Sequence, residues 1–526
     1  MKKHVLSAAI AAASLAGFSS ASMAWNIGTT PDMEVFMSGA TAMDNSIKNM
    51  FENLCDPGTL DFYRNGSDPD PDRVGSAYSA YFCTLSPSKV PNLSASKRVL
   101  FIKRSAGGSA QGVNPLIDGA QLDALNIFGS NVCQPFKANA SGAMTWNCNI
   151  GTPNALVKKY PNIGISDVDP LLFRGPNTPA GFNAVTPAGA QQLEVRAVVA
   201  LIFGIPVTKT LYNALQIVQI DRGELPDTCA VGDYNETCMP SLSKQQVATL
   251  ITGQIKNWDE FKFVASDGQT YPFTQYPGIP SLIQAREAFT NKPFNNFVHF
   301  CKRVAGSGTG AQQYAKFLNN PCTPGALAPS ELDDQFDGPR VLINSGSGNV
   351  DSCLNDFETG NNQGRNVDGT VQNEDIFTGD SYISWAIGVQ SLEKNANDIL
   401  GFRFVKIDGV APTLQNAANG KYMDWVEPTY QWRKSGNGAP TGDTLRIIEK
   451  LVVDAGNPVT VGSVLNLTSN YPFGRSGYLA VASNGHDYSH ILDEFAPVIG
   501  YSHAAVGALN NCAVPVIPVS DADKPL

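Results

Sequence analysis

The chain has 526 residues, a formal net charge of −10 and ten cysteines, and only 16% of its residues are charged. A chain of this length needs two or more lobes to bury its apolar residues. An acidic chain without a basic run argues against nucleic acid or an anionic membrane as the partner.

The first 24 residues have the pattern of a secretory signal. Lys2 and Lys3 precede a short apolar core, and Ser22 and Ala24 supply the small residues of a cleavage site. No later run reaches the roughly 20 apolar residues that a membrane span needs. We therefore expect cleavage near Ala24 and a soluble mature protein in the periplasm, outside the cell or at the cell surface.

The cysteines predict disulfide bonds, because an even number in an exported chain is typical of a bonded framework. The spacing suits two local pairs, allows two more and leaves one distant pair: Cys133–Cys148, Cys229–Cys238, then Cys55–Cys83 and Cys301–Cys322, and finally Cys353–Cys512. Spacing alone does not decide among the connectivities.

Three apolar segments in the first half each end in a short polar loop. Strands are expected at residues 34–37, 98–103 and 163–165, and a helix at 42–54. The loops after the strands read Ser38-Gly39-Ala40-Thr41, Arg104-Ser105-Ala106-Gly107-Gly108 and Ser166-Asp167. Alternation of strand, loop and helix predicts an α/β sheet with ligand-binding loops at the carboxyl ends of its strands.

The second half continues this pattern with longer irregular stretches. Apolar strands are expected at 196–206 and 383–389, and a Ser-capped helix at 242–251. The stretch 345–375, rich in Gly, Asn and Asp, is expected to be loop, whereas 463–467 looks like a strand.

Arg303 precedes a Ser-Gly-Thr loop, residues 307–309, that leads into an expected helix at 311–318. The first N–H groups of a helix are unpaired and lie at its positive dipole end, so an oxyanion fits there. Arg303 can add a two-pronged, charge-assisted bond. The alternative is an ordinary glycine-rich turn in which Ser307 only caps the helix.

Other candidate sites are weaker. Asp68, Asp70 and Asp72 have calcium-type side chains, but the prolines between them favour a solvated turn. His486 and His490 are spaced for a helical metal site, yet no Glu follows His486 as in a zinc-protease motif. We therefore predict no metal and no other cofactor.

An enzyme is the main rival class. The triplet at 306–308 lacks the spacing of a nucleophile elbow, and no phosphate-binding Gly-Lys-Ser/Thr motif occurs. We expect a protein that is not an enzyme, with a phosphatase-like activity as the minor alternative.

Taken in order, these loops resemble those of the periplasmic phosphate-binding proteins of phosphate ABC transporters, which belong to the type II periplasmic-binding-protein superfamily. Two further segments are similar to that family, Ile251-Thr252-Gly253-Gln254-Ile255-Lys256-Asn257-Trp258 and Ala386-Ile387-Gly388-Val389. The resemblance covers about residues 34–433, with large insertions, and leaves the C-terminal segment unexplained.

The resemblance implies a two-lobed α/β fold, with a mixed sheet flanked by helices in each lobe and a hinge of crossing strands near Val198 and Gly388. The implied division is a signal peptide at 1–24, lobe I at 25–198, lobe II at 199–387, a return to lobe I at 388–434 and a C-terminal extension at 435–526. The implied contacts to phosphate are Thr41, Ala42 through its N–H, Ser105, Asp167, Arg303, Ser307, Gly308 and Thr309.

The implied function is capture of phosphate or a similar oxyanion for an ABC permease, by a protein that is more readily a monomer than an oligomer. Asp167 would accept a proton that phosphate carries and sulfate lacks. Ala305 stands where the family has an acidic residue, so the identity of the anion stays open. Arg104 is a second departure, and Ser109 competes with Ser105 for the contact. The alternative is a secreted or surface structural protein whose ligand site is altered or lost.

Overall fold

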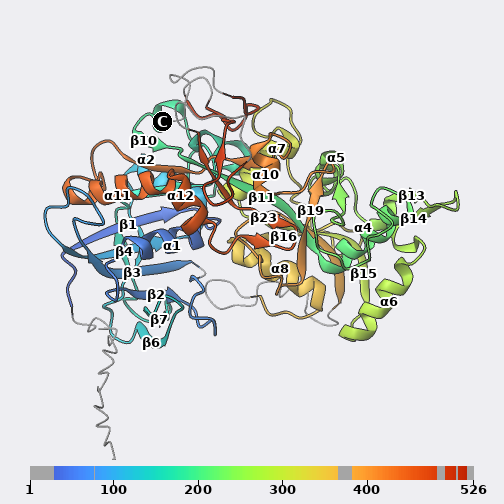
Figure 1. The fold of residues 1–526 in the computed structure, drawn as a ribbon, viewed down its shortest axis with the longest axis horizontal. Coiled ribbons are helices and arrows are strands. Elements are labelled where there is room, and N and C mark those ends of the chain that lie inside the picture. The colour runs from blue at the N-terminus through green and yellow to red at the C-terminus, as the bar shows by residue number, and fades with distance from the viewer. Residues whose placement is uncertain (1–28, 76, 365–381, 483–491, 505–507, 518–526) are drawn as a thin grey trace, which may run out of the picture.

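The computed structural model describes residues 29–75, 77–364, 382–482, 492–504 and 508–517, so the expected signal and both histidines of the 486/490 pair lie outside the described residues. The described chain forms two large mixed sheets flanked by helices (Figure 1). This confirms the predicted α/β class. No helix of the described part is both long enough and apolar enough to cross a membrane.

The first sheet has a parallel centre. Strand β1 runs parallel to β4 on one side and to β9 on the other, so the loops that follow these three strands leave from one edge of the sheet. Among the described residues its strands, in spatial order, are β10 (Leu193–Arg196), β21 (Thr429–Arg433), β9 (Ile163–Ser166), β1 (Met33–Gly39), β4 (Lys97–Arg104), β3 (Tyr78–Leu85), β2 (Asp61–Asn65), β7 (Met144–Cys148) and β6 (Cys133–Ala138).

Both faces of the first sheet are covered. Alternate residues of β1 point to opposite faces, so Val35 packs with Phe51 and Leu451 while Phe36 packs with Ala124. The elements that supply these contacts are α1 (Asp44–Leu54) and α11 (Gly442–Ala455) on one face, and the hairpin of β5 (Leu122–Leu125) and β8 (Leu156–Lys159) on the other.

The second sheet repeats the parallel arrangement at β16, β15 and β17. Its path is β12 (Ser241–Leu242), β19 (Phe402–Ile407), β11 (Val199–Thr208), β17 (Ile383–Gly388), β15 (Phe294–Arg303) and β16 (Arg340–Asn344). The short strands attached to β11 are β18 (Gln390–Ser391), β20 (Trp425–Val426) and β24 (Tyr478–Val481), and β24 also pairs with β25 (Val498–Ile499).

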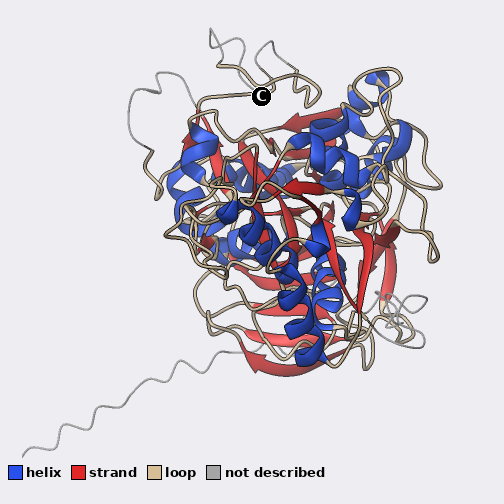
Figure 2. Cartoon of the chain, turned by 90° about the vertical axis from the view of Figure 1, so that its right-hand side faces the viewer, coloured by secondary structure: helices blue, strands red, loops and turns tan. Residues whose placement is uncertain are grey.

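Helices flank the second sheet. They are α4 (Lys209–Asp221), α5 (Lys244–Ile251), α6 (Ile279–Thr290), α7 (Gly308–Leu318) and α8 (Ser347–Thr359). The end of the molecule where α4 and α6 lie in Figure 1 faces the viewer in Figure 2. Shorter elements of the described chain include α2 (Asn114–Asp118), α3 (Pro187–Ala190), α10 (Leu414–Ala418), α12 (Pro458–Thr460), β13 (Lys262–Val264), β14 (Thr270–Pro272), β22 (Asn470–Tyr471) and β23 (Gly474–Arg475).

Two elements belong to both hydrophobic cores. We call each sheet, with the helices and the core packed on it, a lobe. All ten residues of β11 are buried, and its side chains alternate between the two cores: Leu201 packs in the core of the first lobe and Ile202 in that of the second. Helix α7 divides in the same way, because Ala311 packs with the first lobe and Phe317 with the second. The two lobes therefore share buried elements and are not separate domains joined by a linker.

The chain path differs in places from the expected one. Both β18 and β19 pair with β11, so the chain rejoins the first sheet at β21, later than the expected boundary at residue 388. The C-terminal segment is built into the fold, because α11 packs against α1 and β24 hydrogen-bonds to β11.

Two local predictions were wrong. The expected loop at 345–375 contains helix α8, whose apolar side chains at Val350, Leu354 and Phe357 are fully buried. The expected strand at 463–467 falls largely in a short π-helical turn, η6 (Val461–Leu465), which packs against α1. In both cases burial of one face of a helix outweighs a composition that favours loop or strand.

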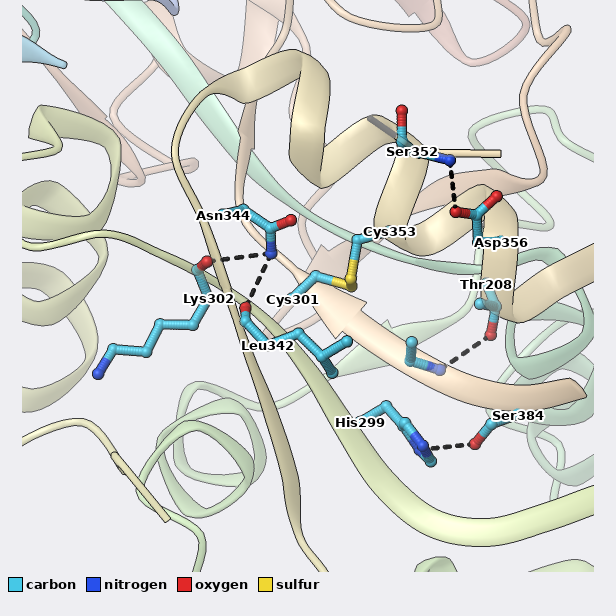
Figure 3. The surroundings of a disulfide bond; sticks show 12 residues. Thr208, His299, Cys301, Lys302, Leu342, Asn344, Ser352, Cys353, Asp356 and Ser384 are labelled. Atoms are coloured by element: carbon cyan, nitrogen blue, oxygen red, sulfur yellow. Dashed lines mark hydrogen bonds between the residues drawn. A yellow bond between two sulfur atoms is a disulfide. The ribbon is translucent and has the colours of Figure 1, made fainter. Parts of the chain in front are cut away.

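Five disulfides join the described cysteines. Three were predicted, Cys55–Cys83, Cys133–Cys148 and Cys229–Cys238. The expected pairs Cys301–Cys322 and Cys353–Cys512 were wrong. Cys301 on β15 pairs with Cys353 on α8, which packs over that strand (Figure 3), and Cys322 pairs with Cys512. The missed helix explains the error, since α8 brings Cys353 onto β15.

Candidate functional site

Polar side chains from both lobes meet between the loop edges of the two sheets. The first lobe contributes Thr41, after β1, and Asp167, after β9. The second contributes Arg303, the last residue of β15, and Thr309, in the first turn of α7. Hydrogen bonds across the lobes join Arg303 to Thr41 at 3.2 Å and Thr309 to Asp167 at 2.9 Å.

Arg303 is a buried cation, 1% exposed, among neutral partners. Its guanidinium donates to the hydroxyls of Thr41, Ser347 and Thr309 and to the carbonyl of Ser345, at 3.1 to 3.3 Å. Its Nε has no partner in the described chain, and no described carboxylate lies within ion-pair distance. Burial lowers the pKa of Arg303 to about 10, against the opposing pull of Asp167.

Asp167 is buried beside this cation. Its Oδ2 accepts from Thr309 Oγ1 at 2.9 Å, whereas its Oδ1 has no partner among the described residues. Burial raises the pKa of Asp167, and the hydrogen bond from Thr309 and the charge of Arg303 partly oppose that shift. The orphaned Oδ1 and the orphaned Nε of Arg303 together match a ligand that both accepts and donates, such as a protonated oxyanion.

The start of α7 lies directly against the first lobe. Ser307 caps the helix, its hydroxyl oxygen accepting from the Gly310 N–H at 3.2 Å, and its O–H proton stays available as a donor. A Cβ on Gly308 would lie 2.4 Å from Ser109 Oγ and 2.8 Å from Asp167 Cβ, so only glycine fits there. The two interpretations of this loop, helix cap and anion cradle, are therefore compatible.

Ser105 and Ser109 occupy different places. Ser105 Oγ donates to Asp44 at 2.6 Å and accepts from Lys103 at 2.9 Å. Ser109 Oγ instead accepts from the Asp167 N–H at 3.1 Å. Of the two competing serines, Ser109 therefore lies beside the cluster, whereas Ser105 hydrogen-bonds to both members of the Lys103–Asp44 ion pair within the first lobe.

The remaining expected residues are peripheral to the cluster. Ala42 is buried, and its carbonyl accepts from Ser391 of the second lobe at 3.1 Å. Ala305 is exposed, so it takes no part in the cluster. Arg104 donates within its own loop, to the carbonyl of Ala106 and to Gln111.

Sequence reasoning missed two contributors. Ser347, fully buried at the start of α8, lies between Arg303 and Thr41, with its Oγ 3.1 Å and 3.0 Å from their polar atoms. Lys103, also buried, donates to the carbonyls of Gly39 and Ala40 at 2.8 and 2.9 Å and so fixes the loop before Thr41. The helical spacing of Val350, Leu354 and Phe357 was the signal that could have located Ser347.

The acidic turn at 68–72 is organised by a protein cation. Arg64 donates to the backbone carbonyls of Asp68, Asp70 and Arg73, all within 2.7 Å. The described residues contain no group of three or more His, Cys, Asp or Glu side chains arranged to hold a metal ion.

No protein-family model matches the chain, and no curated protein matches it. Among solved structures, a putative phosphate ABC transporter substrate-binding protein with bound phosphate, from Clostridium perfringens, is 13% identical over 83% of this chain and 98% of its own, with a TM-score of 0.38.

Two further solved structures give similar values. An ABC-type phosphate transport receptor from Vibrio cholerae is 11% identical over 80% of this chain and 93% of its own, with a TM-score of 0.34. PstS from Borrelia burgdorferi is 11% identical over 86% of this chain and 100% of its own, with a TM-score of 0.32. These scores are low, so the case for an oxyanion site rests on the geometry of this chain.

Proposed function

We propose that this protein is an exported solute-binding protein that captures phosphate or a similar oxyanion between its two lobes. The observation that carries the proposal is Arg303, a buried guanidinium without a carboxylate partner among the described residues that donates to hydroxyls of both lobes. A buried charge is costly unless it is paired. An oxyanion would supply the missing counter-charge, and hydroxyl and helix-start donors would satisfy its oxygens.

The two lobes would close around the anion. Thr41 and Asp167 lie on one lobe and Arg303, Ser307 and Thr309 on the other, so one ligand contacts both only when they are together. The anion then favours the closed state through contacts that an open state lacks. In an uptake system, the closed form would be presented to an ABC permease from the periplasmic side, by a monomer without a catalytic role.

Calorimetry on the oxidised protein tests the proposal. We expect phosphate binding, and we expect Arg303→Ala to weaken it by about 2 to 5 kcal/mol, since the substitution removes the buried charge that pairs with the anion. Arg446→Ala, at an exposed arginine that pairs with Asp443, is the matched control. If Arg303→Ala binds phosphate with near-normal affinity, Arg303 is not part of the binding site.

One observation favours an alternative, a protein that keeps the fold with an altered or lost ligand site. The hydroxyls of Thr41 and Ser347 already hydrogen-bond to each other across the lobes at 3.0 Å. Absence of binding to phosphate, arsenate and sulfate would support this alternative. A phosphatase would require turnover of a phosphate ester that is lost in Ser307→Ala.

A further inference from the structure

The amino-terminal end of α8 lies against the arginine of the candidate site. Ser347 begins this 13-residue helix and is fully buried. Its Oγ accepts from Arg303 Nη1 at 3.1 Å, and Arg303 Nη2 donates to the carbonyl of Ser345 just before the helix. Arg303 is only 1% exposed and its Nε has no partner among the described residues, so the side chain that lies against the helix start is a buried cation with an unused donor.

Ser347 also contacts the first lobe. Its Oγ lies 3.0 Å from Thr41 Oγ1, and its N–H donates to the same oxygen at 3.3 Å. An anion held by Arg303 and Thr41 must therefore replace these bonds and touch Ser347 as well. The hydroxyl and the N–H at the positive end of the helix dipole are both donors suited to an oxyanion.

Hydrogen bonds from Gln390 hold Ser347 in position. Gln390 Nε2 donates to the Ser347 carbonyl at 2.7 Å and to Asp351 Oδ1 at 2.6 Å. Gln390 is itself fully buried on β18, which pairs with β11. A donor that is held in place before the ligand arrives loses little entropy on binding.

We propose that Ser347 and the start of α8 complete the oxyanion site and occupy the place beside Arg303 where an acidic partner would otherwise neutralise it. The inference rests on the proposed function and deepens it. A neutral hydroxyl leaves the guanidinium charge for the ligand. The ligand class is a tetrahedral oxyanion with at least three acceptor oxygens, one each for Arg303, for Thr41 and for Ser347.

Calorimetric titration of the full, oxidised chain with inorganic phosphate tests this assignment. Ser347→Ala should weaken binding by about tenfold to a hundredfold, because a hydrogen bond to a charged ligand is lost. Ser347→Asp should weaken it more, because a carboxylate would pair with Arg303 and repel the anion. Ser352→Ala removes a hydroxyl from the same helix that bonds to the Gly348 carbonyl, and should leave the affinity unchanged.

The outcomes distinguish the role of Ser347 from the proposed function of the protein. If the natural protein binds phosphate and Ser347→Ala binds it within twofold, the role of Ser347 is overturned while the proposed function stands. If the natural protein binds none of phosphate, arsenate and sulfate, both are overturned. Thermal unfolding of each variant shows whether a loss reflects the site: a weaker Ser347→Ala with an unchanged unfolding temperature supports the assignment, and a Ser347→Asp that folds and binds as tightly as the natural protein contradicts it.

Discussion

Arg303 donates hydrogen bonds to hydroxyl groups from three separate segments of the chain. The arginine, Thr309 and Asp167 lie in short local patterns, and the resemblance of these patterns to the phosphate-binding family implied that the three residues share one site. Ser347 is 44 residues from Arg303. The apolar spacing in α8 could have located the helix that Ser347 begins, but its contact with Arg303 follows only from the packing of α8 on β15. Ser109 was separable from Ser105 only through its bond to the Asp167 N–H.

The charge of Asp167 leads to a prediction about whether the site binds phosphate or sulfate. An ionised Asp167 would repel sulfate and leave a bond unmade, whereas phosphate can donate its proton to Oδ1. Asp167→Asn replaces the charge with an amide that donates, so sulfate affinity should rise by about tenfold or more. Calorimetry with sulfate measures it, with Asp337→Asn, at an exposed site, as the control.

The direction of the pKa shift extends this prediction to pH. Burial raises the pKa of Asp167, so lowering the pH protonates it more readily than an exposed aspartate. Sulfate binding by the natural protein should therefore improve as the pH falls, and Asp167→Asn should show a much weaker pH dependence. A pH-independent sulfate affinity in the natural protein would contradict this account.

At the scale of elements, the strongly apolar strands and the capped helices were predictable and the polar helix was not. Helix α5 has the Ser243–Gln246 capping box that its sequence indicates. Helix α8 has Gly, Asn and Asp in its first turns, which are poor helix formers, and the sheet beneath it supplies the burial that stabilises it. Helix propensity is a property of the local sequence, whereas the stability of α8 depends on its packing against β15 and β17.

The start of α1 depends on a buried carboxyl group from the other lobe. Glu393, 5% exposed, accepts from the Asn45 N–H at 3.2 Å and from Tyr478 at 2.8 Å. Burial raises the pKa of Glu393 to about 7. The native state therefore holds this proton more tightly than the unfolded state, and the stabilisation present below the usual pKa of 4.5 is lost as the pH rises through 7.

Glu393→Gln should make the protein more stable at high pH, because the amide keeps the hydrogen-bonding shape without ionising. We expect a gain in the free energy of unfolding of about 1 to 3 kcal/mol at pH 8 and little change at pH 5. Urea unfolding at both values measures it, with the exposed Glu449→Gln as the control. An equal loss of stability at both values would show that the carboxylate itself is required.

At the scale of the whole molecule, the C-terminal segment fastens the two lobes together. Cys512 is bonded to Cys322, beyond the end of α7, and the neighbouring Asn511 accepts from the Asp169 N–H at 2.7 Å. His503 adds bonds to Lys316 of α7 at 2.7 Å and to Glu427 at 2.6 Å. The segment thus spans from the loop after β9 to α7, and these two elements carry Asp167 and Thr309.

Removing this disulfide should cost more stability than removing a local one. The Cys322–Cys512 bond closes a separation of 190 residues and Cys229–Cys238 one of 9. Loop entropy predicts about 5 kcal/mol for the first and about half of that for the second. Urea unfolding of the two double Cys→Ser variants compares them. If phosphate binds, its dissociation should also be faster without the long bond, and stopped-flow release would detect that.

The pairing of β24 with the central strand β11 determines how late in the chain the fold can be completed. Strand β11 forms near residue 200, yet β24 lies near residue 480 and the long disulfide needs Cys512. Neither lobe is complete until these late residues have arrived. Folding of both lobes can therefore finish only when almost the whole polypeptide is present, and a disulfide between Cys322 and an earlier cysteine would leave Cys512 without its partner.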